Sequence, residues 1–235
     1  MNDDRVDVWS ASLALHRPAL RRLEKIVSSD ERGRAERFRS DLARADYIVT
    51  RGLLRTILAG YLRVHPDEIA LGRDGKGKPE IAGRLRREKL RFNVAHSGGR
   101  VAYAVTRGRE VGIDLERIAH DVPAEALAER FFSEEEAAGI RRLPSPDRRQ
   151  AFFTIWTLKE AYLKATGEGL RGLDQIDLSR ARRCSADSWR VEVPGSRTAW
   201  SLRTFVPDVG YVGAVAVGGP GCRVRFLPAL SARVS

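Results

Sequence analysis

Two acidic residues stand two positions apart in the segment "VGIDLE" (111–116). Side chains alternate along an extended strand, so Asp114 and Glu116 would share one face, where Gly112 leaves space beside them. Paired carboxylates of this kind suit a hard divalent cation. A strand whose polar face meets solvent is the competing interpretation, and it is the better one unless a further acidic residue joins the pair.

Glu160 is the candidate for that third acid. It lies in "IWTLKEAYLKATGEGL" (155–170), a helical pattern that is apolar on nearly every side and therefore predicts a buried helix. Buried charges need partners that offset their desolvation. No histidine or cysteine accompanies Asp114, Glu116 and Glu160, so the set would be all-oxygen, which favours Mg²⁺ or Mn²⁺ over zinc.

Lys164 follows Glu160 by one helical turn. An ammonium that holds a phosphate, one turn from a carboxylate that holds metal or accepts a proton, would serve phosphoryl chemistry. A plain surface pair that supports the helix explains the spacing equally well, although it does not explain the surrounding aromatic residues. We expect Lys159 to lie near the apolar rim and to extend its ammonium to solvent.

Basic residues in the first half form a second candidate set. Arg44, Arg51 and Arg55 share one stripe of a predicted helix, and the glycine-rich loop "LGRDGKGKPEI" (71–81) could approach a ligand closely. The spacing of a Walker-type phosphate loop is missing there. Taken singly, each of these residues is equally well explained as a charge exposed to solvent. The positions that could meet an anionic ligand are Arg51, Arg73, Lys76, Lys78 and His96.

Composition sets outer limits on the function. The 235 residues are 43% apolar and 31% charged, with a net charge of +11, which fits a soluble protein with a polyanionic partner. Neither a membrane span nor a basic-then-apolar signal at the start is evident, and the two cysteines have no metal-ligand spacing. We therefore expect a cytoplasmic protein with no membrane partner.

The pattern of predicted elements occurs twice. Each half reads as a strand, a short helix, a long helix, a glycine-bearing loop and a strand pair; the long helices fall at 41–63 and 147–166. Ser133 and Glu136 have the spacing of a capping box. Strands at 188–193, 198–206 and 210–217 are predicted to close the chain. The predicted fold is α+β, with similar halves at 1–109 and 110–235 and the active site in the cleft between them.

The segments "FNVAHSGG", "VGIDLE", "RFFSEEE" and "WTLKEAYLKATGEGL" occur in this order over most of the chain. Together they resemble the phosphopantetheinyl transferase family, in particular its pseudo-dimeric branch typified by the surfactin-synthetase activator. The resemblance implies transfer of the phosphopantetheine arm of coenzyme A to a serine of an acyl or peptidyl carrier protein, with release of adenosine bisphosphate.

The resemblance also implies roles for single residues. Asp114, Glu116 and Glu160 would bind Mg²⁺, Glu160 or a metal-bound water would accept the serine proton, and Lys164 would hold the phosphate. Arg51, Arg73, Lys76, Lys78, His96 and Lys164 would contact coenzyme A. Ala95 departs from the family, which usually has serine there, and we expect a lost hydroxyl contact to the ligand.

Two other functions fit parts of the sequence. A basic nucleic-acid-binding module would explain the charge, but the tryptophans lie mainly in patterned core segments and not on a stacking face. A non-catalytic scaffold that binds coenzyme A has Ala95 as its support and the intact acidic set against it. We expect a monomeric enzyme whose macromolecular partner is an acidic carrier protein and not a nucleic acid.

Overall fold

The structure is a computed structural model, and it describes residues 4–15, 17–169, 173, 176–192, 199–219 and 221–228. The first half contains β1 (Arg5–Ser12), α1 (Arg17–Ile26), α2 (Ser29–Ala35), α3 (Asp41–Leu62), β2 (Leu71–Arg73), β3 (Pro79–Ile81), β4 (Leu90–Ser97) and β5 (Arg100–Arg107). The second half contains β6 (Val111–Arg117), α4 (Ala124–Phe131), α5 (Glu134–Arg142), α6 (Ser145–Thr166), β7 (Arg182–Ser185), β8 (Ser188–Val191), β9 (Trp200–Phe205), β10 (Tyr211–Gly218) and β11 (Arg223–Phe226).

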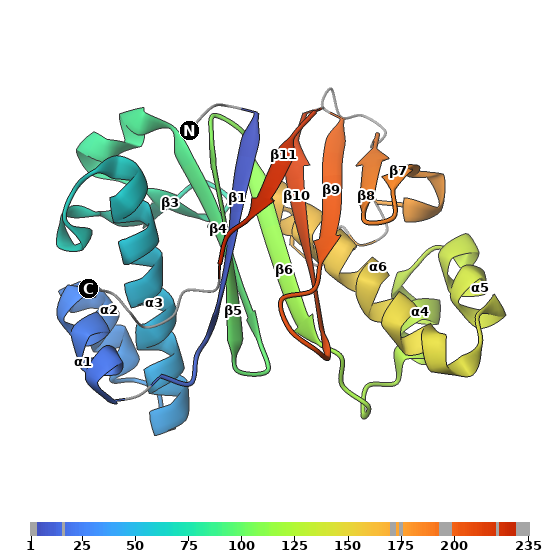
Figure 1. Ribbon diagram of the computed structural model, residues 1–235, viewed down its shortest axis with the longest axis horizontal. Coiled ribbons are helices and arrows are strands. Elements are labelled where there is room, and N and C mark those ends of the chain that lie inside the picture. The colour runs from blue at the N-terminus through green and yellow to red at the C-terminus, as the bar shows by residue number, and fades with distance from the viewer. Residues whose placement is uncertain are drawn as a thin grey trace.

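Each half has its own sheet with a long helix packed on it (Figure 1). The strand order is β11-β1-β5-β4 in the first sheet and β6-β10-β9-β8-β7 in the second. α3 and α6 both have 22 residues and lie against the outer faces of these sheets. The predicted α+β fold with two similar halves is confirmed.

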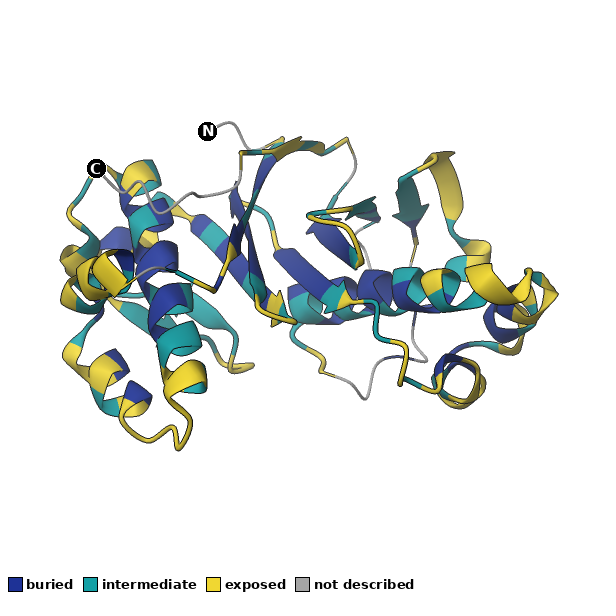
Figure 2. Ribbon diagram, turned by 60° about the horizontal axis from the view of Figure 1, so that its bottom comes forward, coloured by how far each residue is buried: buried dark blue, intermediate teal, exposed yellow. Residues whose placement is uncertain are grey.

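A small-residue core joins the two halves. Alanines and valines of β1, β4, β5, β6 and β10 form one buried cluster between the sheets, which includes Ala95, Ala104, Val111 and Ile113. In Figure 2 the buried residues, in dark blue, lie on the sides of α3 and α6 that face the strands. They continue through the strands between the two helices. Burial of this surface at roughly 25 cal/mol per Å² makes the junction a core and not a flexible hinge.

The periodic segments of the sequence form the elements that they predict. α3 and α6 match the predicted long helices, and Ser133 caps α5 by accepting a hydrogen bond from the amide of Glu136 (3.2 Å) while the Glu136 carboxylate accepts one from the amide of Ser133 (2.8 Å). Residues 193 and 198, at the ends of two predicted strands, and residues 170–172 of the predicted loop 167–173 lie outside the described residues.

Strand β11 was not expected from the sequence. It follows the strands predicted to close the chain, and it pairs in parallel with β1 of the first half, with Arg223 opposite Arg5 and Phe226 opposite Val8. The end of the second half therefore completes the sheet of the first. A four-residue strand with exposed residues carries too little pattern to be recognised without its partner.

Candidate active site

β6 and α6 touch along their backbones, and this contact positions the acidic residues. A Cβ atom placed on Gly112 would lie 2.0 Å from the carbonyl oxygen of Ala161 and 2.4 Å from the amide nitrogen of Ala165. Only glycine permits this approach of strand to helix. The face of β6 that carries Gly112 therefore presents Asp114 and Glu116 to α6, which carries Glu160 and Lys164.

Asp114, Glu160 and Lys164 meet at this contact. The ammonium of Lys164 donates to Oδ1 of Asp114 at 2.6 Å, so Lys164 pairs with the strand carboxylate rather than with Glu160 on its own helix. Asp114 is 3% exposed. Oδ2 of Asp114 and Oε1 of Glu160 are buried without a hydrogen-bond partner. Buried oxygens without a partner are uncommon in folded proteins, and each of these two retains the capacity to bind a cation or a hydrogen-bond donor.

The charges of the carboxylates act on each other. Burial and then the negative charge of Asp114 raise the pKa of Glu160 to about 7, against the opposing charge of Lys164. Burial and the charge of Asp114 also raise the pKa of Glu116, while a hydrogen bond from Ser97 and the charge of Lys164 lower it. A carboxylate with a pKa near neutrality can both accept and release a proton at physiological pH.

Glu116 is held from the other half of the molecule. The hydroxyl of Ser97, at the end of β4, donates to Oε2 of Glu116 at 2.9 Å and accepts from the amide of Arg117 at 3.1 Å. Nearby, the side-chain oxygen of Asn93 accepts a hydrogen bond from the amide of Ile113 (3.0 Å). β4 and β6 thus join the halves beside the acidic residues, and the site lies at their junction.

The donor set has the chemistry of a Mg²⁺ site. Three carboxylates, two of them with an unpaired buried oxygen, would be relieved of mutual repulsion by a divalent cation. Across the part of the chain that the structure describes, however, no three acidic, histidine or cysteine side chains are closed around a common point. The residues fit a hard cation by type, burial and charge, while their side chains are not drawn together as a ligand cage.

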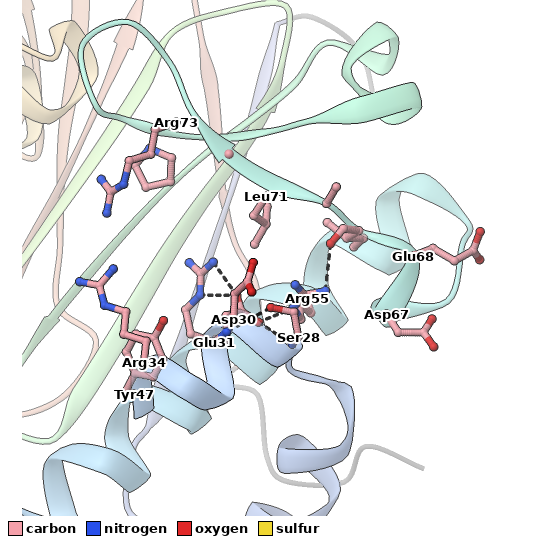
Figure 3. A pocket seen from close by; sticks show the side chains of 15 residues that line it. Ser28, Asp30, Glu31, Arg34, Tyr47, Arg55, Asp67, Glu68, Leu71 and Arg73 are labelled. Atoms are coloured by element: carbon pink, nitrogen blue, oxygen red, sulfur yellow. Dashed lines mark hydrogen bonds and ion pairs between the residues drawn. The ribbon is translucent and has the colours of Figure 1, made fainter. Parts of the chain in front are cut away.

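A pocket of about 670 Å³ lies in the first half, between α2, α3 and the β2–β3 hairpin. Arg34, Arg51 and Arg73 line it, and Figure 3 shows the guanidinium groups of Arg34 and Arg73 pointing to the same side. Tyr47 lies beneath Arg34, 5.7 Å from ring centroid to guanidinium carbon. Cations beside an aromatic face suit a ligand that carries phosphate and a flat ring.

Glu31 fixes the arginines on α3. Its two oxygens accept from Nε of Arg51 (2.6 Å) and Nε of Arg55 (2.7 Å). Burial acts to raise the pKa of Glu31, but the charge of Arg51, the amide of Ser28 and Arg55 outweigh it, and the pKa lies below its ordinary value. Both arginines line the pocket, and Arg55, which is 3% exposed, lies at its buried end.

The other predicted basic residues have different surroundings. Lys78 and Lys76 are directed at the end of α6: Lys78 donates to the carbonyl oxygen of Ala165 (3.0 Å), and Lys76 to that of Thr166 (2.7 Å). His96 is exposed on β4, and its charge opposes the raised pKa that burial gives Asp46 of α3.

The expectation that Lys159 reaches solvent is wrong. Lys159 is 1% exposed, and its ammonium pairs with Oε2 of Glu136 at 2.8 Å. It also donates to the carbonyl oxygens of Leu173 (3.1 Å) and Ile176 (2.7 Å) and lies 5.2 Å from the ring centroid of Phe132. The full set of partners offsets the desolvation of the ammonium.

Both halves of the chain match one enzyme family. Residues 9–108 match the 4'-phosphopantetheinyl transferase N-terminal family, and residues 110–216 match the 4'-phosphopantetheinyl transferase superfamily. The 4'-phosphopantetheinyl transferase HetI of Nostoc sp. is 38% identical over 223 residues, which cover 95% of this chain and 92% of that protein. This chain is a member of the 4'-phosphopantetheinyl transferase family.

More distant members of the family extend the comparison. A 4'-phosphopantetheinyl transferase of Bacillus pumilus is 31% identical over 206 residues, with 87% of this chain and 84% of that protein covered. The 4'-phosphopantetheinyl transferase Sfp of Bacillus subtilis is 26% identical over 201 residues, with 85% of each chain covered. The resemblance drawn from the sequence motifs is therefore confirmed, and the chain is a transferase enzyme.

Ala95 has a different place in this transferase from the one expected. Its side chain is 4% exposed and belongs to the cluster between the two sheets, with Ala102 and Ala104 of β5. A hydroxyl at this position would lie in an apolar interior, where an unpaired polar group is costly. Alanine here is explained by the packing of the two sheets.

Several residues around the site were not identified from the sequence. Glu31, Arg34 and Tyr47 meet their partners through tertiary contacts. The capping-box spacing of Ser28 and Glu31 was the one local signal, and it marks a helix start and not a ligand pocket. Among the described residues, no helix combines the length and apolarity needed to cross a bilayer.

Proposed function

We propose that this transferase moves the phosphopantetheine arm of coenzyme A to a serine of an acyl or peptidyl carrier protein, with Mg²⁺ bound by Asp114, Glu116 and Glu160. The observation that carries the proposal is the pair of buried, unpartnered oxygens of Asp114 and Glu160 next to Lys164. A divalent cation and a pyrophosphate would satisfy both oxygens and the ammonium.

The transfer makes and breaks one bond at phosphorus. The serine oxygen bonds to the phosphorus that carries the pantetheine arm, the pyrophosphate bond to that phosphorus breaks, and adenosine bisphosphate leaves with the bond electrons. Such reactions depend mainly on positioning and charge neutralisation. When bound, Mg²⁺ supplies part of the neutralisation at the pyrophosphate.

This chain's own residues supply the remainder. Glu160 is the candidate acceptor of the serine proton, directly or through water. The ammonium of Lys164 holds Oδ1 of Asp114 at 2.6 Å and offers a positive charge for the leaving phosphate. Ser97 holds Glu116 in its orientation.

The pocket in the first half is the proposed site for the nucleotide end of coenzyme A. Arg34, Arg51 and Arg73 would meet phosphate, and Tyr47 offers an aromatic surface. Lys164 lies at the junction of the halves and His96 is exposed on β4 on the side of Asp46 of α3; both are proposed contacts of coenzyme A. The net charge of +11 would attract both coenzyme A and an acidic carrier protein.

Intact-mass measurement tests this function. Purified protein is incubated with coenzyme A, Mg²⁺ and a panel of carrier proteins in their apo form, with and without chelator. We expect the phosphopantetheine mass to appear on at least one carrier, and chelator to abolish the addition. A Ser→Ala variant of that carrier at the acceptor position should remain unmodified.

Glu160→Gln is the matched variant of the enzyme. The neutral amide keeps the shape of the side chain but loses the charge, and we expect transfer to fall by about a hundredfold or more. Glu134→Gln removes one exposed carboxylate on α5, away from the candidate site, and should leave the transfer rate unchanged. Failure of the wild-type protein to modify every carrier in the panel would contradict the proposed function.

A further inference from the structure

The turn between β2 and β3 has a fixed shape. Oδ1 of Asp74 accepts hydrogen bonds from the amides of Lys76 and Lys78, both at 2.9 Å, and the amide of Gly77 donates to the carbonyl oxygen of Asp74 at 3.0 Å. Gly77 has a φ of 82°, which favours glycine. The two lysines therefore project from a pre-ordered turn and not from a loose loop.

Both lysine side chains cross to the second half. Lys78 donates to the carbonyl oxygens of Val111 (2.9 Å), where β6 begins, and of Ala165 (3.0 Å), where α6 ends, and pairs with Glu110 at 3.1 Å. Its side chain is 10% exposed. One ammonium thus ties together the two elements that carry the acidic residues.

Lys76 completes the contact at the end of α6. It donates to the carbonyl oxygen of Thr166 at 2.7 Å, and its side chain packs so closely on Gly167 that an added Cβ there would lie 2.9 Å from Cδ of Lys76. The last carbonyl oxygens of a helix have no partner within the helix and carry partial negative charge. Two cations from the first half fill this need for the helix of Glu160 and Lys164.

We propose that Lys78, supported by Lys76, is a positioning residue that locks α6 against β6 and thereby sets the spacing of Glu160 and Lys164 from Asp114. The consequence for the transfer rate rests on the proposed function. The same turn continues from Arg73, which lines the nucleotide pocket, so it joins the pocket to the end of the catalytic helix.

This role differs from a direct contact with coenzyme A. The hydrogen bonds of Lys78 go to two backbone carbonyl oxygens and a carboxylate of this chain, and burial lowers its pKa against the opposing charge of Glu110. A lysine that binds phosphate would affect only the binding of coenzyme A. A positioning lysine also affects the packing of α6 on β6 in the ligand-free protein, so the two roles can be measured separately.

Hydrogen exchange on metal-free, ligand-free protein is the first test, and it is independent of any activity. In Lys78→Met, which keeps the aliphatic stem, the amides of residues 163–167 and 111–113 should exchange about tenfold faster or more, because the carbonyl oxygens of Val111 and Ala165 lose their donor. Lys78→Arg should restore most of the protection. Lys25→Met on exposed α1 serves as the matched control and should leave these amides unchanged.

Kinetics and ligand binding form the second test. In Lys78→Met, kcat should fall about tenfold or more, while the Kd for coenzyme A, measured with chelator present, should change by less than about threefold. Unchanged exchange in residues 163–167, or a Kd for coenzyme A about tenfold weaker with kcat preserved, would overturn the proposal in favour of a ligand contact.

The two tests also separate this proposal from the proposed function. If wild-type protein modifies no carrier, the proposed function fails, yet the exchange experiment still decides whether Lys78 holds α6 on β6. If Lys78→Met does not fold, Lys76→Met, at an exposed residue, is used for the exchange test at residues 165–167. We expect a smaller acceleration of exchange there, and an unchanged exchange rate would contradict the proposal.

Discussion

The two halves of this transferase use the same device to fix their long helices. Arg55 of α3 and Lys159 of α6 stand at the same position of helices that begin at Asp41 and Ser145. Each is buried, and each pairs with the glutamate of a capping box, Arg55 with Glu31 at 2.7 Å and Lys159 with Glu136 at 2.8 Å. The short helices α2 and α5 are therefore attached to α3 and α6 in the same way.

The device also holds the chain after each long helix. Arg55 donates to the carbonyl oxygens of Pro66 and Ile69, both at 2.9 Å. Lys159 donates to those of Leu173 and Ile176 in the corresponding place. Because both cations have complete sets of partners, this shared feature stabilises the fold and explains the charge at position 159 without any catalytic role.

The halves differ in the strand carboxylate beside each long helix. Asp7 of β1 is fully buried and accepts from Tyr61 at 2.6 Å and from two nitrogens of Arg225 at 2.9 Å each. Asp114 of β6 has one oxygen on Lys164 and the other without a partner. A saturated carboxylate contributes stability, whereas an unsaturated one has capacity left for a ligand. Each half thus has a buried strand carboxylate beside its long helix, fully paired in the first half and with one unpaired oxygen in the second.

Exchanging each strand carboxylate for its amide is the strongest test of this comparison. Asp114→Asn should lower the transfer rate by about a hundredfold or more, because it removes a charged ligand of the proposed Mg²⁺ site. Asp7→Asn should lower the free energy of unfolding by about 1–3 kcal/mol and leave transfer by the folded protein intact. Denaturant unfolding and intact-mass rates measure the two effects, and loss of transfer in folded Asp7→Asn would break the comparison.

Removing the buried cations should show that the shared device is structural. Lys159→Met should lower the free energy of unfolding by about 3–5 kcal/mol, because the buried Glu136 loses its cation. Arg55→Met should lower it by a smaller amount, because Glu31 keeps its pair with Arg51. In the second half, adding Glu136→Gln to Lys159→Met should recover part of the loss caused by Lys159→Met.

A double-mutant cycle in urea measures this coupling, with Lys25→Met as the surface control. If Glu136→Gln and Lys159→Met destabilise the protein additively, the pair does not interact in solution. Such a result would remove the proposed equivalence of the two halves.

Alanine at two helix-packing glycines sharpens the contrast further. In Gly112→Ala the new methyl meets the backbone oxygen of Ala161 at 2.0 Å, so α6 must move from β6; we expect a loss of about 1–3 kcal/mol and a reduced transfer rate. In Gly52→Ala it meets the side chain of Leu23 at 2.7 Å, so stability falls while transfer by the folded protein persists. Equal transfer rates in folded Gly112→Ala and wild type would contradict the role of this contact.

The smallest effect expected is on the pH dependence of stability. Glu160 follows Lys159, and the residue that follows Arg55 is Thr56, which does not titrate. The pKa of Glu160 is raised from 4.5 to about 7, so the folded state binds more protons than the unfolded state between these values. In metal-free protein this contribution is therefore greatest at low pH and declines as pH rises from about 4.5 to about 7.

Glu160→Gln should lack that decline. Subtracting its unfolding free energy from that of wild type at each pH isolates the Glu160 contribution, since the other carboxylates are common to both proteins. A difference that stays constant across this window would show that the carboxylate is not perturbed in the folded state.

Much of the fold was predictable because it is local. Apolar periodicity marked α3 and α6 to within a few residues, and alternation marked β4, β5 and β6. α1 and α4 were missed, as was β11, because short elements with exposed faces carry little pattern. The candidate acids were predictable from their residue types and from their resemblance to the family motifs.

The surroundings of those residues were not predictable from local pattern. Lys159 was expected at the surface, yet its partner Glu136 lies on a different helix. Lys78 was expected at a ligand, yet the structure directs it at the backbone of β6 and α6. Both contacts join segments far apart in the chain, where spacing carries no information about distance.

The sequence by itself determined the long helices, the central strands, the family and the acidic and basic residues available for chemistry, because these depend on side-chain type and local periodicity. Only the tertiary structure decided which charges are satisfied within the chain and which are left for a ligand. The physical reason is that desolvation and pairing depend on neighbours in space: Asp7 and Asp114 are both buried strand carboxylates, and their partners alone make one structural and leave the other open.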